Sequence, residues 1–298
     1  MTSEQGVVYD LGYQPHDGPR LGRRGAIFAT IRDGLRRILG IRRKARKKVM
    51  PWVLFGIALL PVIAIVGWSF LVESVFEGLE ADNPFAGHAN IFNLTASMFL
   101  IFTALAGPEL LIPDRVEGVL SVYASRPMRV SDYLGARAAA LAIAAGGFLV
   151  IPQLILYLGL ATLDSDGWFS GLVNNFSDVP KFLLASLFYL LAYGAPAFLV
   201  AMFAKRLGPA WGMYLAVMLL SSAFATWISS TTAGIGRYTA LAALSINPDI
   251  VTDWLFDRST FREGITGAGF DPVWSVGVIV GVAVVTWLIG LRRYRSLL

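Results

Sequence analysis

Long apolar runs alternate with short polar segments along this chain. A membrane-spanning helix needs about 20 mostly apolar residues to cross about 30 Å of hydrocarbon. Six runs are long enough, and each should be helical because lipid offers no partner to an unpaired backbone N–H or C=O group. We therefore expect an all-α membrane protein with six transmembrane helices. The predicted spans cover residues 51–72, 91–112, 134–163, 182–204, 207–229 and 273–291.

The basic residues lie almost entirely on one side of these predicted spans. Of the 25 Lys and Arg residues, all but four fall in residues 1–50, 109–137 or 205–206, or after residue 291. Loops rich in Lys and Arg stay in the cytoplasm, so both chain termini are predicted to be cytoplasmic. The four exceptions are Lys181, Arg237, Arg258 and Arg262.

Composition agrees with a membrane location and excludes several kinds of chemistry. Hydrophobic residues make up 56% of the chain and charged residues 15%, against about 45–50% and 25% in soluble domains. The absence of Cys excludes a disulfide framework and any Cys-ligated metal. His16 and His88 lie far apart in polar segments and are expected to be solvated loop residues. The net charge of +5 follows from the topology, so nucleic-acid binding is not needed to explain it.

Two segments precede the first predicted span. Residues 1–23 are rich in Gly, Pro and polar groups and are expected to be extended. Residues 24–50 place apolar side chains at helical spacing among many Arg and Lys residues, which predicts a basic amphipathic helix that enters the first span at Pro51. Two interpretations of this helix are open. It either only fixes the topology, or it lies at the membrane surface near anionic headgroups and also contacts a cytoplasmic partner.

The segment between the second and third predicted spans contains several helix start and stop signals. Pro113 should end the second span. Asp114, followed three residues later by Glu117, resembles a capping box and predicts a short helix over residues 114–126, ended by Pro127. Such a helix is a rigid connector that could transmit a push between two spans. Many membrane proteins, however, have a capped interfacial helix with no such role.

A motif extends from this loop into the third predicted span. It combines a Glu-Gly-x-Leu sequence, a Pro after a basic residue, and a Tyr-Leu-Gly entry followed by a basic residue. Its residues are Glu117, Gly118, Leu120, Arg126, Pro127, Tyr133, Leu134, Gly135 and Arg137. In this motif, and in its six-span layout over residues 24–298, the chain resembles the permease subunits of type-2 ABC transporters.

This resemblance implies a docking site for a separate ATPase subunit. In the family, the helix between the second and third spans is a coupling helix that sits in a cleft of the ATPase. A short link such as Lys205-Arg206 makes a second, smaller contact. The implied ATPase-coupling residues are Asp114, Arg115, Glu117, Gly118, Leu120, Tyr123, Arg126, Lys205 and Arg206.

The segment before the last predicted span, residues 230–272, is extracytoplasmic in this topology. It is too polar to face lipid, yet Ala240–Ile246 and Ile250–Phe256 are amphipathic enough to form short outer helices. Asn247-Pro248 should separate them. The resemblance implies that such helices close the outer end of a transport pathway.

The sequence lacks the motifs of common nucleotide-binding and hydrolytic sites. It contains no Gly-x-x-x-x-Gly-Lys-(Ser/Thr), no Gly-x-Ser-x-Gly and no His-Glu-x-x-His. We therefore expect a non-catalytic subunit that binds no cofactor or metal itself, with ATP and Mg²⁺ held by the partner ATPase. The centres of the predicted spans carry no ionisable residue, which argues against proton coupling.

Aromatic side chains are frequent in the predicted spans. Most are expected to pack against other spans or to form interface belts. The alternative is a lipophilic translocation surface, which would suit an amphipathic or lipid-like cargo. The candidate pathway residues are Phe99, Phe102, Tyr157, Tyr193, Trp211 and Tyr214.

The leading hypothesis from the sequence is a permease subunit of the bacterial plasma (inner) membrane. It would pair with a second permease chain, identical or different, and recruit two ATPase subunits. It would then export a hydrophobic or amphipathic substrate by alternating access, in contact with membrane lipids and not with nucleic acid. Two other hypotheses stay open. They are a membrane anchor that recruits a cytoplasmic partner without transport, and an ion-coupled carrier.

Overall fold

Helices make up all the regular structure that is described for this chain. The computed structural model describes residues 21–41, 45–75, 87–124, 128–231, 234–258 and 271–295. The helices are α1 (Gly22–Ile38), α2 (Ala45–Val75), α3 (His88–Val116), α4 (Leu120–Ala124), α5 (Val130–Ala161), α6 (Trp168–Asn174), α7 (Asp178–Phe203), α8 (Leu207–Thr231), the 3-10 helix η1 (Gly234–Ala242), α9 (Asn247–Leu255) and α11 (Val273–Arg295).

Some of the predicted features lie outside these described residues. They are residues 1–20 of the segment expected to be extended, together with His16, Arg126 and Pro127.

Six helices are long and apolar enough to cross a membrane, namely α2, α3, α5, α7, α8 and α11. Each covers one of the predicted apolar runs, although α5 and α7 end two and one residues before their runs do. This confirms the prediction of a helical chain with six segments long and apolar enough to span a membrane. Helix α3 extends beyond its apolar run at both ends, and α5 begins about one turn before its run. The extensions contain polar residues whose side chains bond to other helices, so the helices continue where the apolar pattern stops.

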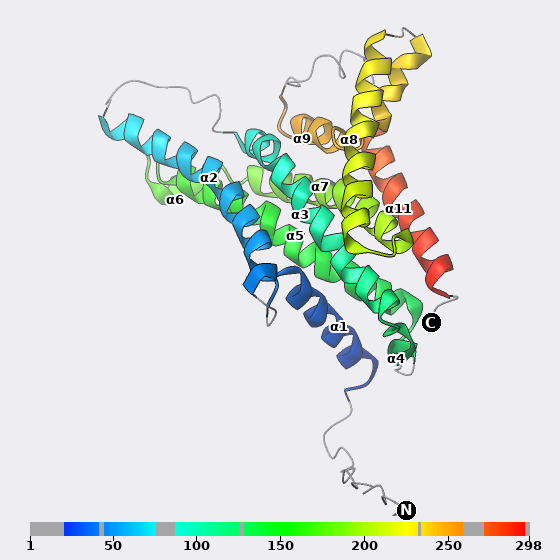
Figure 1. Ribbon diagram of the computed structural model, residues 1–298. Helices are drawn as coiled ribbons and strands as arrows, with labels where there is room; N and C mark the ends of the chain where they lie inside the picture. Colours follow the sequence, from blue (N-terminus) through cyan, green and yellow to red (C-terminus); the bar gives the residue numbers. More distant parts are fainter. Residues whose placement is uncertain are drawn as a thin grey trace, which may run out of the picture.

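Helices α3 and α7 are the most buried of the spans and form the centre of the bundle (Figure 1). Helix α5 packs against both, α2 packs against α3 and α5, and α11 and α8 pack on the other side. At one end of the bundle, α3, α7 and α11 finish and α5 and α8 begin, and α4 lies there too. We call this the basic end, defined by residues 115–124, 128–130, 204–206 and 292–295.

The basic N-terminal helix is shorter than predicted and does not run into the first span. Helix α1 starts inside the segment expected to be extended and stops at Ile38, whereas α2 begins at Ala45. Gly40 causes the break, because its φ of +64° is left-handed and turns the chain. The N–H of Ile41 then donates to the carbonyl oxygen of Arg36 at 2.9 Å, a bond typical of a glycine-terminated helix.

Helix α1 packs against α5 and α3. Its buried residues are Thr30, Gly34 and Ile38, one helical turn apart. Gly34 lies at the closest approach, because a Cβ atom added there would lie only 2.6 Å from the Cβ of Ala140. This helix is therefore a packed part of the bundle.

The helices before α11 differ from the prediction. Helix η1 ends at Ala242 and is followed by turns, so the predicted helix Ala240–Ile246 is wrong. Asn247-Pro248 begins α9 instead of separating two helices, since a Pro in the first helical turn loses no hydrogen bond. Most of the second predicted helix is confirmed within α9, which packs against α7 and α11.

His88 is buried, so the expectation of a solvated loop residue is wrong. Its ring stacks between those of Phe182 and Phe256, with centroids 5.3 and 5.7 Å away. Its Nδ1 atom lies 2.7 Å from Oε1 of Gln153. The polar residues that precede it in sequence gave no sign of these partners, which come from α5, α7 and the turn after α9.

The close approach at Gly34 gives a first test of the packing of α1. Gly34→Leu should lower the free energy of unfolding by about 1–3 kcal/mol, because the added side chain overlaps Ala140. Gly212→Leu on α8 is the matched control, since an added Cβ there meets no atom within 4 Å. Denaturant unfolding in detergent compares the two, and equal stabilities would contradict the packing.

Candidate functional site

Helix α3 runs further than the sequence pattern indicated. Pro113 lies inside α3, which ends at Val116, so Pro113 does not end the second span. Asp114 lies within the last turn of α3 and caps no new helix. The predicted coupling helix over residues 114–126 is therefore wrong in its bounds. The short helix α4 begins at Leu120.

A glycine turn connects α3 to α4. Glu117 is the C-cap of α3, and Gly118 follows with a φ of +70°. The N–H of Val119 donates to the carbonyl oxygen of Asp114 at 3.0 Å. This is the Schellman arrangement, in which Gly adopts the left-handed conformation without the steric cost of a Cβ. The turn is thus fixed by backbone geometry.

Asp114 does not act as a cap because its side chain points into the bundle. Only 1% of that side chain is exposed. Its Oδ2 accepts hydrogen bonds from Nη2 of Arg137 at 2.5 Å and from the hydroxyl of Tyr133 at 2.8 Å. Its Oδ1 accepts a bond from Nη1 of Arg37 at 2.8 Å. A carboxylate with three donors is better stabilised here than at an exposed helix terminus.

A second carboxylate completes a four-charge cluster made of Asp33, Arg37, Asp114 and Arg137. Oδ2 of Asp33 lies 2.8 Å from Nε of Arg37 and 3.0 Å from Nη1 of Arg137. The Arg137 side chain is fully buried. Two positive and two negative charges balance, which satisfies the rule that buried charges must be paired. The cluster joins α1, α3 and α5.

Aromatic rings attach α4 to this cluster. Nη2 of Arg137 donates to the hydroxyl of Tyr123 at 3.1 Å. The guanidinium lies over the rings of Tyr133 and Tyr123, at 5.6 and 6.0 Å from their centroids, within the range of cation–π attraction. Burial, joined by the negative charges of Asp114 and Asp33, raises the pKa of Tyr123 despite the opposing effect of Arg137. Tyr123 therefore remains a neutral phenol at physiological pH.

Arg115 connects the end of α3 to the link between α7 and α8. Its guanidinium donates to the carbonyl oxygens of Met202 and Ala204. Arg293 of α11 also donates to the Met202 carbonyl, at 2.9 Å. Both arginines satisfy carbonyls that the end of α7 leaves without helical partners. Three spans therefore meet next to the exposed Lys205-Arg206 link.

The implied coupling residues divide by burial. Glu117, Gly118, Lys205 and Arg206 are exposed, so they are available to a partner. Asp114 and Leu120 are buried, while Arg115 and Tyr123 are half-buried. The buried and half-buried members hold the exposed turn and the link in place. Arg126 lies outside the described residues.

The structure brings four of the six candidate pathway residues together. Phe99 and Phe102 are buried, and Phe99 lies against the ring of Tyr193 with centroids 5.5 Å apart. The hydroxyl of Tyr214 donates to the carbonyl oxygen of Tyr193 at 3.1 Å. These four form packed core between α3, α7 and α8. Tyr157 lies apart from them, with its hydroxyl on the carbonyl oxygen of Leu172.

The sixth candidate, Trp211, lines a cavity of about 380 Å³ beside the four-charge cluster. Its indole Nε1 is buried and has no hydrogen-bond partner in the described structure. Charged and apolar side chains share the cavity wall, and Arg37 belongs to both the wall and the cluster. The lining residues come from α1, α2, α3 and α8: Arg37, Ile38, Met50, Pro51, Phe102, Leu105, Ala106, Glu109, Leu207 and Trp211.

The described residues contain no group of three or more His, Asp and Glu side chains that could hold a metal ion. The sequence matches no protein-family model and no curated protein. The geometry at the basic end and the motif found there are therefore the observations that bear on function.

Two residues of the cluster, Asp33 and Arg37, were not anticipated from the sequence. Both lie in the segment predicted to be a basic amphipathic helix, and Tyr133, which donates to Asp114, was predicted only as part of the motif. One signal was present, since Asp33 is the one acidic residue of α1 and lies one turn before Arg37. Asp114, which accepts hydrogen bonds from Arg37 and Tyr133, lies 77 positions after Arg37.

Removing the central carboxylate tests the cluster. Asp114→Asn should cost about 3–5 kcal/mol of stability, because it leaves two buried guanidinium groups with one carboxylate. Asp132→Asn is the matched control, since the Arg23–Asp132 pair also joins α1 to α5 but Arg23 is 47% exposed; it should cost much less than Asp114→Asn, because solvent screens an exposed ion pair. Denaturant unfolding measures both, and a cost for Asp114→Asn no larger than the control would contradict the role of the cluster.

The acid dependence of α1 docking tests Asp33. Partial burial favours the neutral acid, but Arg37 and Arg137 outweigh it and hold the pKa of Asp33 below its ordinary value of 3.8. A carboxyl group whose pKa is lowered by folding stabilises the folded state at pH values above its ordinary pKa. That stabilisation is lost as the pH falls through the lowered pKa. Asp33→Asn should therefore flatten the fall in stability between about pH 5 and pH 2. Asp166→Asn, exposed at the far end, should keep the wild-type slope; an unchanged slope for Asp33→Asn would contradict the assignment.

Proposed function

We propose that this chain is the membrane-spanning permease subunit of a type-2 ABC transporter, located in a bacterial plasma membrane. The observation that carries the proposal is the exposed Glu117-Gly118 turn, which directly follows the last turn of α3, where Asp114 of the four-charge cluster is buried. A surface that receives mechanical work must be exposed to its partner and rigidly connected to the parts that move. The turn meets both requirements.

The mechanism follows from these connections. A separate ATPase subunit, which supplies ATP and Mg²⁺, docks on the turn and on the Lys205-Arg206 link. A displacement of the turn moves α3, and the cluster passes that motion to α1 and α5. Arg115 passes it to the end of α7. Packed elements with discrete arrangements respond to such a push as rigid units, which suits alternating access in a pair of permease chains.

The cavity beside Trp211 supports a hydrophobic or amphipathic substrate. Its apolar wall from Phe102 and Leu105 would bind a hydrocarbon portion, while Arg37 and Glu109 add charge to its lining. The buried indole N–H of Trp211 offers a donor to a polar group of the ligand. A sugar or a bare ion would find few partners in such a wall.

The packing of α1 favours a permease over a membrane anchor. An anchor helix that recruits a cytoplasmic partner needs a free face. The cluster instead ties Asp33 and Arg37 of α1 to the spans. A proton-coupled carrier would need ionisable groups near the middle of the spans, whereas the four-charge cluster lies toward their basic end.

Charge reversal at the turn tests the docking role. Glu117→Arg should weaken capture of the proposed ATPase subunit by about tenfold, the effect of losing roughly 1.4 kcal/mol at an interface charge. It should also abolish substrate-stimulated ATP hydrolysis in proteoliposomes. Asp166→Arg makes the same change at the opposite end of the bundle and should leave both unchanged.

The outcomes separate the hypotheses. Wild-type capture and stimulated hydrolysis in Glu117→Arg would overturn the docking assignment. Capture of the ATPase without any stimulation of hydrolysis would favour an anchor. Transport that survives ATP depletion and collapses with an uncoupler would favour an ion-coupled carrier.

A further inference from the structure

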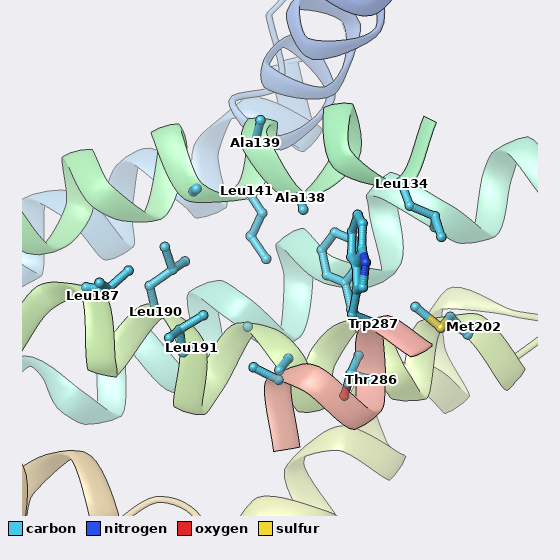
Figure 2. A pocket seen from close by; sticks show the side chains of 15 residues that line it. Leu134, Ala138, Ala139, Leu141, Leu187, Leu190, Leu191, Met202, Thr286 and Trp287 are labelled. Atoms are coloured by element: carbon cyan, nitrogen blue, oxygen red, sulfur yellow. The ribbon is translucent and has the colours of Figure 1, made fainter. Parts of the chain in front are cut away.

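A second cavity lies on another side of the bundle, between α5, α7 and α11 (Figure 2). Its volume is about 380 Å³, within the range of roughly 300–1,000 Å³ found for ligand pockets. The lining side chains are almost all hydrocarbon, and they belong to three helices that are long and apolar enough to span a membrane. The surrounding medium at this depth is therefore lipid, and the cavity is a groove in the lipid-facing surface.

Small residues create the groove. Ala138 and Ala142 on α5 face Gly194 and Ala195 on α7, and their short side chains leave space between two helices that otherwise pack closely. Trp287 of α11 inserts between α5 and α7 toward one end, as Figure 2 shows. Larger side chains at these positions would fill the space.

The groove is long and narrow. Along α7 its lining runs from Leu187 to Met202, a length of about 22 Å at 1.5 Å per helical residue. Leu187 and Trp287 are 46% and 38% exposed, so the groove is open to the bilayer. An extended acyl chain fits this shape. A whole helix, about 10 Å across, does not fit.

The groove ends near exposed positive charge. Leu134, Met202 and Trp287 line the end that lies toward the basic end of the bundle. Arg129 precedes α5 there, and Arg295 follows Trp287 by about two helical turns on α11; both are exposed. The nearby Asp132 is already neutralised by Arg23 at 2.6 Å. A chain in the groove would therefore have its headgroup at the end of the bundle that carries these arginines.

We propose that this groove binds one acyl chain of an anionic membrane phospholipid, with the phosphate held near Arg129 and Arg295. The lipid fills space that the Ala and Gly residues leave open, and the arginines select its charge. This lipid site is separate from the Trp211 cavity and does not depend on the proposed transport function.

Photo-crosslinking in nanodiscs tests the site with the full chain. The probes are phosphatidylglycerol and phosphatidylcholine that carry a diazirine in one acyl chain, present at equal trace amounts in otherwise neutral lipid. Peptides that contain residues 134–142, 187–202 and 283–287 should be labelled most strongly. Phosphatidylglycerol should label them about fivefold more than phosphatidylcholine, the factor that corresponds to roughly 1 kcal/mol.

Variants separate the acyl site from the headgroup site. Ala138→Phe fills the groove and should lower labelling of residues 187–202 about fivefold or more, as expected when a ligand pocket is blocked. Ala216→Phe, exposed on α8 away from the groove, is the matched control and should leave that labelling unchanged. Arg129→Gln with Arg295→Gln should keep acyl labelling but remove the preference for phosphatidylglycerol.

The results that overturn the proposal are equally specific. Uniform labelling of all lipid-facing helices would exclude a groove site, and equal labelling by the two wild-type probes would exclude charge selection. Chain-to-chain crosslinks through residues 134–142 in place of lipid adducts would show that a second copy covers the groove. The wild-type comparison needs no substitution, so a misfolded variant would not leave the proposal untested.

Discussion

The structure depends on the need to pair charges that lie within the bundle. Asp114 and Arg137 come from α3 and α5, and both side chains are almost completely buried. Neither could stay charged there alone, since an unpaired buried charge costs several kcal/mol. The pair also draws in Arg37 and, through it, Asp33. A helix with a strongly basic sequence is thereby fixed to the side of a membrane bundle.

This pairing also determines the shape of the basic end. Because the Asp114 side chain is occupied inside the bundle, it cannot cap a new helix, and α3 continues until Gly118 allows a left-handed turn. The result is a short exposed turn on a rigid base instead of a long loop helix. Arg115 adds a connection to the end of α7. The residues that carry the motif are thus mostly the support for the exposed surface, and only a few of them form it.

The two cavities differ in whether charged side chains line them. The one beside Trp211 shares Arg37 with the cluster and contains Glu109, so its wall is both charged and apolar. The groove between α5, α7 and α11 is lined almost entirely by hydrocarbon. An amphipathic ligand suits the first cavity. A lipid whose tail and headgroup occupy separate zones suits the second.

The sequence by itself determined the six membrane-spanning helices, the side on which the basic residues gather and the exposed Lys205-Arg206 link. These features depend on local hydrophobicity and charge, which can be added up along the chain. The sequence pattern gave the wrong end for α3, joined α1 to α2 and placed His88 in solvent. In each case the outcome depended on partners or backbone conformations that a local pattern does not contain. The Asp114 side chain accepts a bond from Arg137 in place of capping a helix, and the left-handed conformation of Gly40 ends α1 early. Only the tertiary structure decided which charges were paired between helices, because these pairs join residues 23 to 109 positions apart.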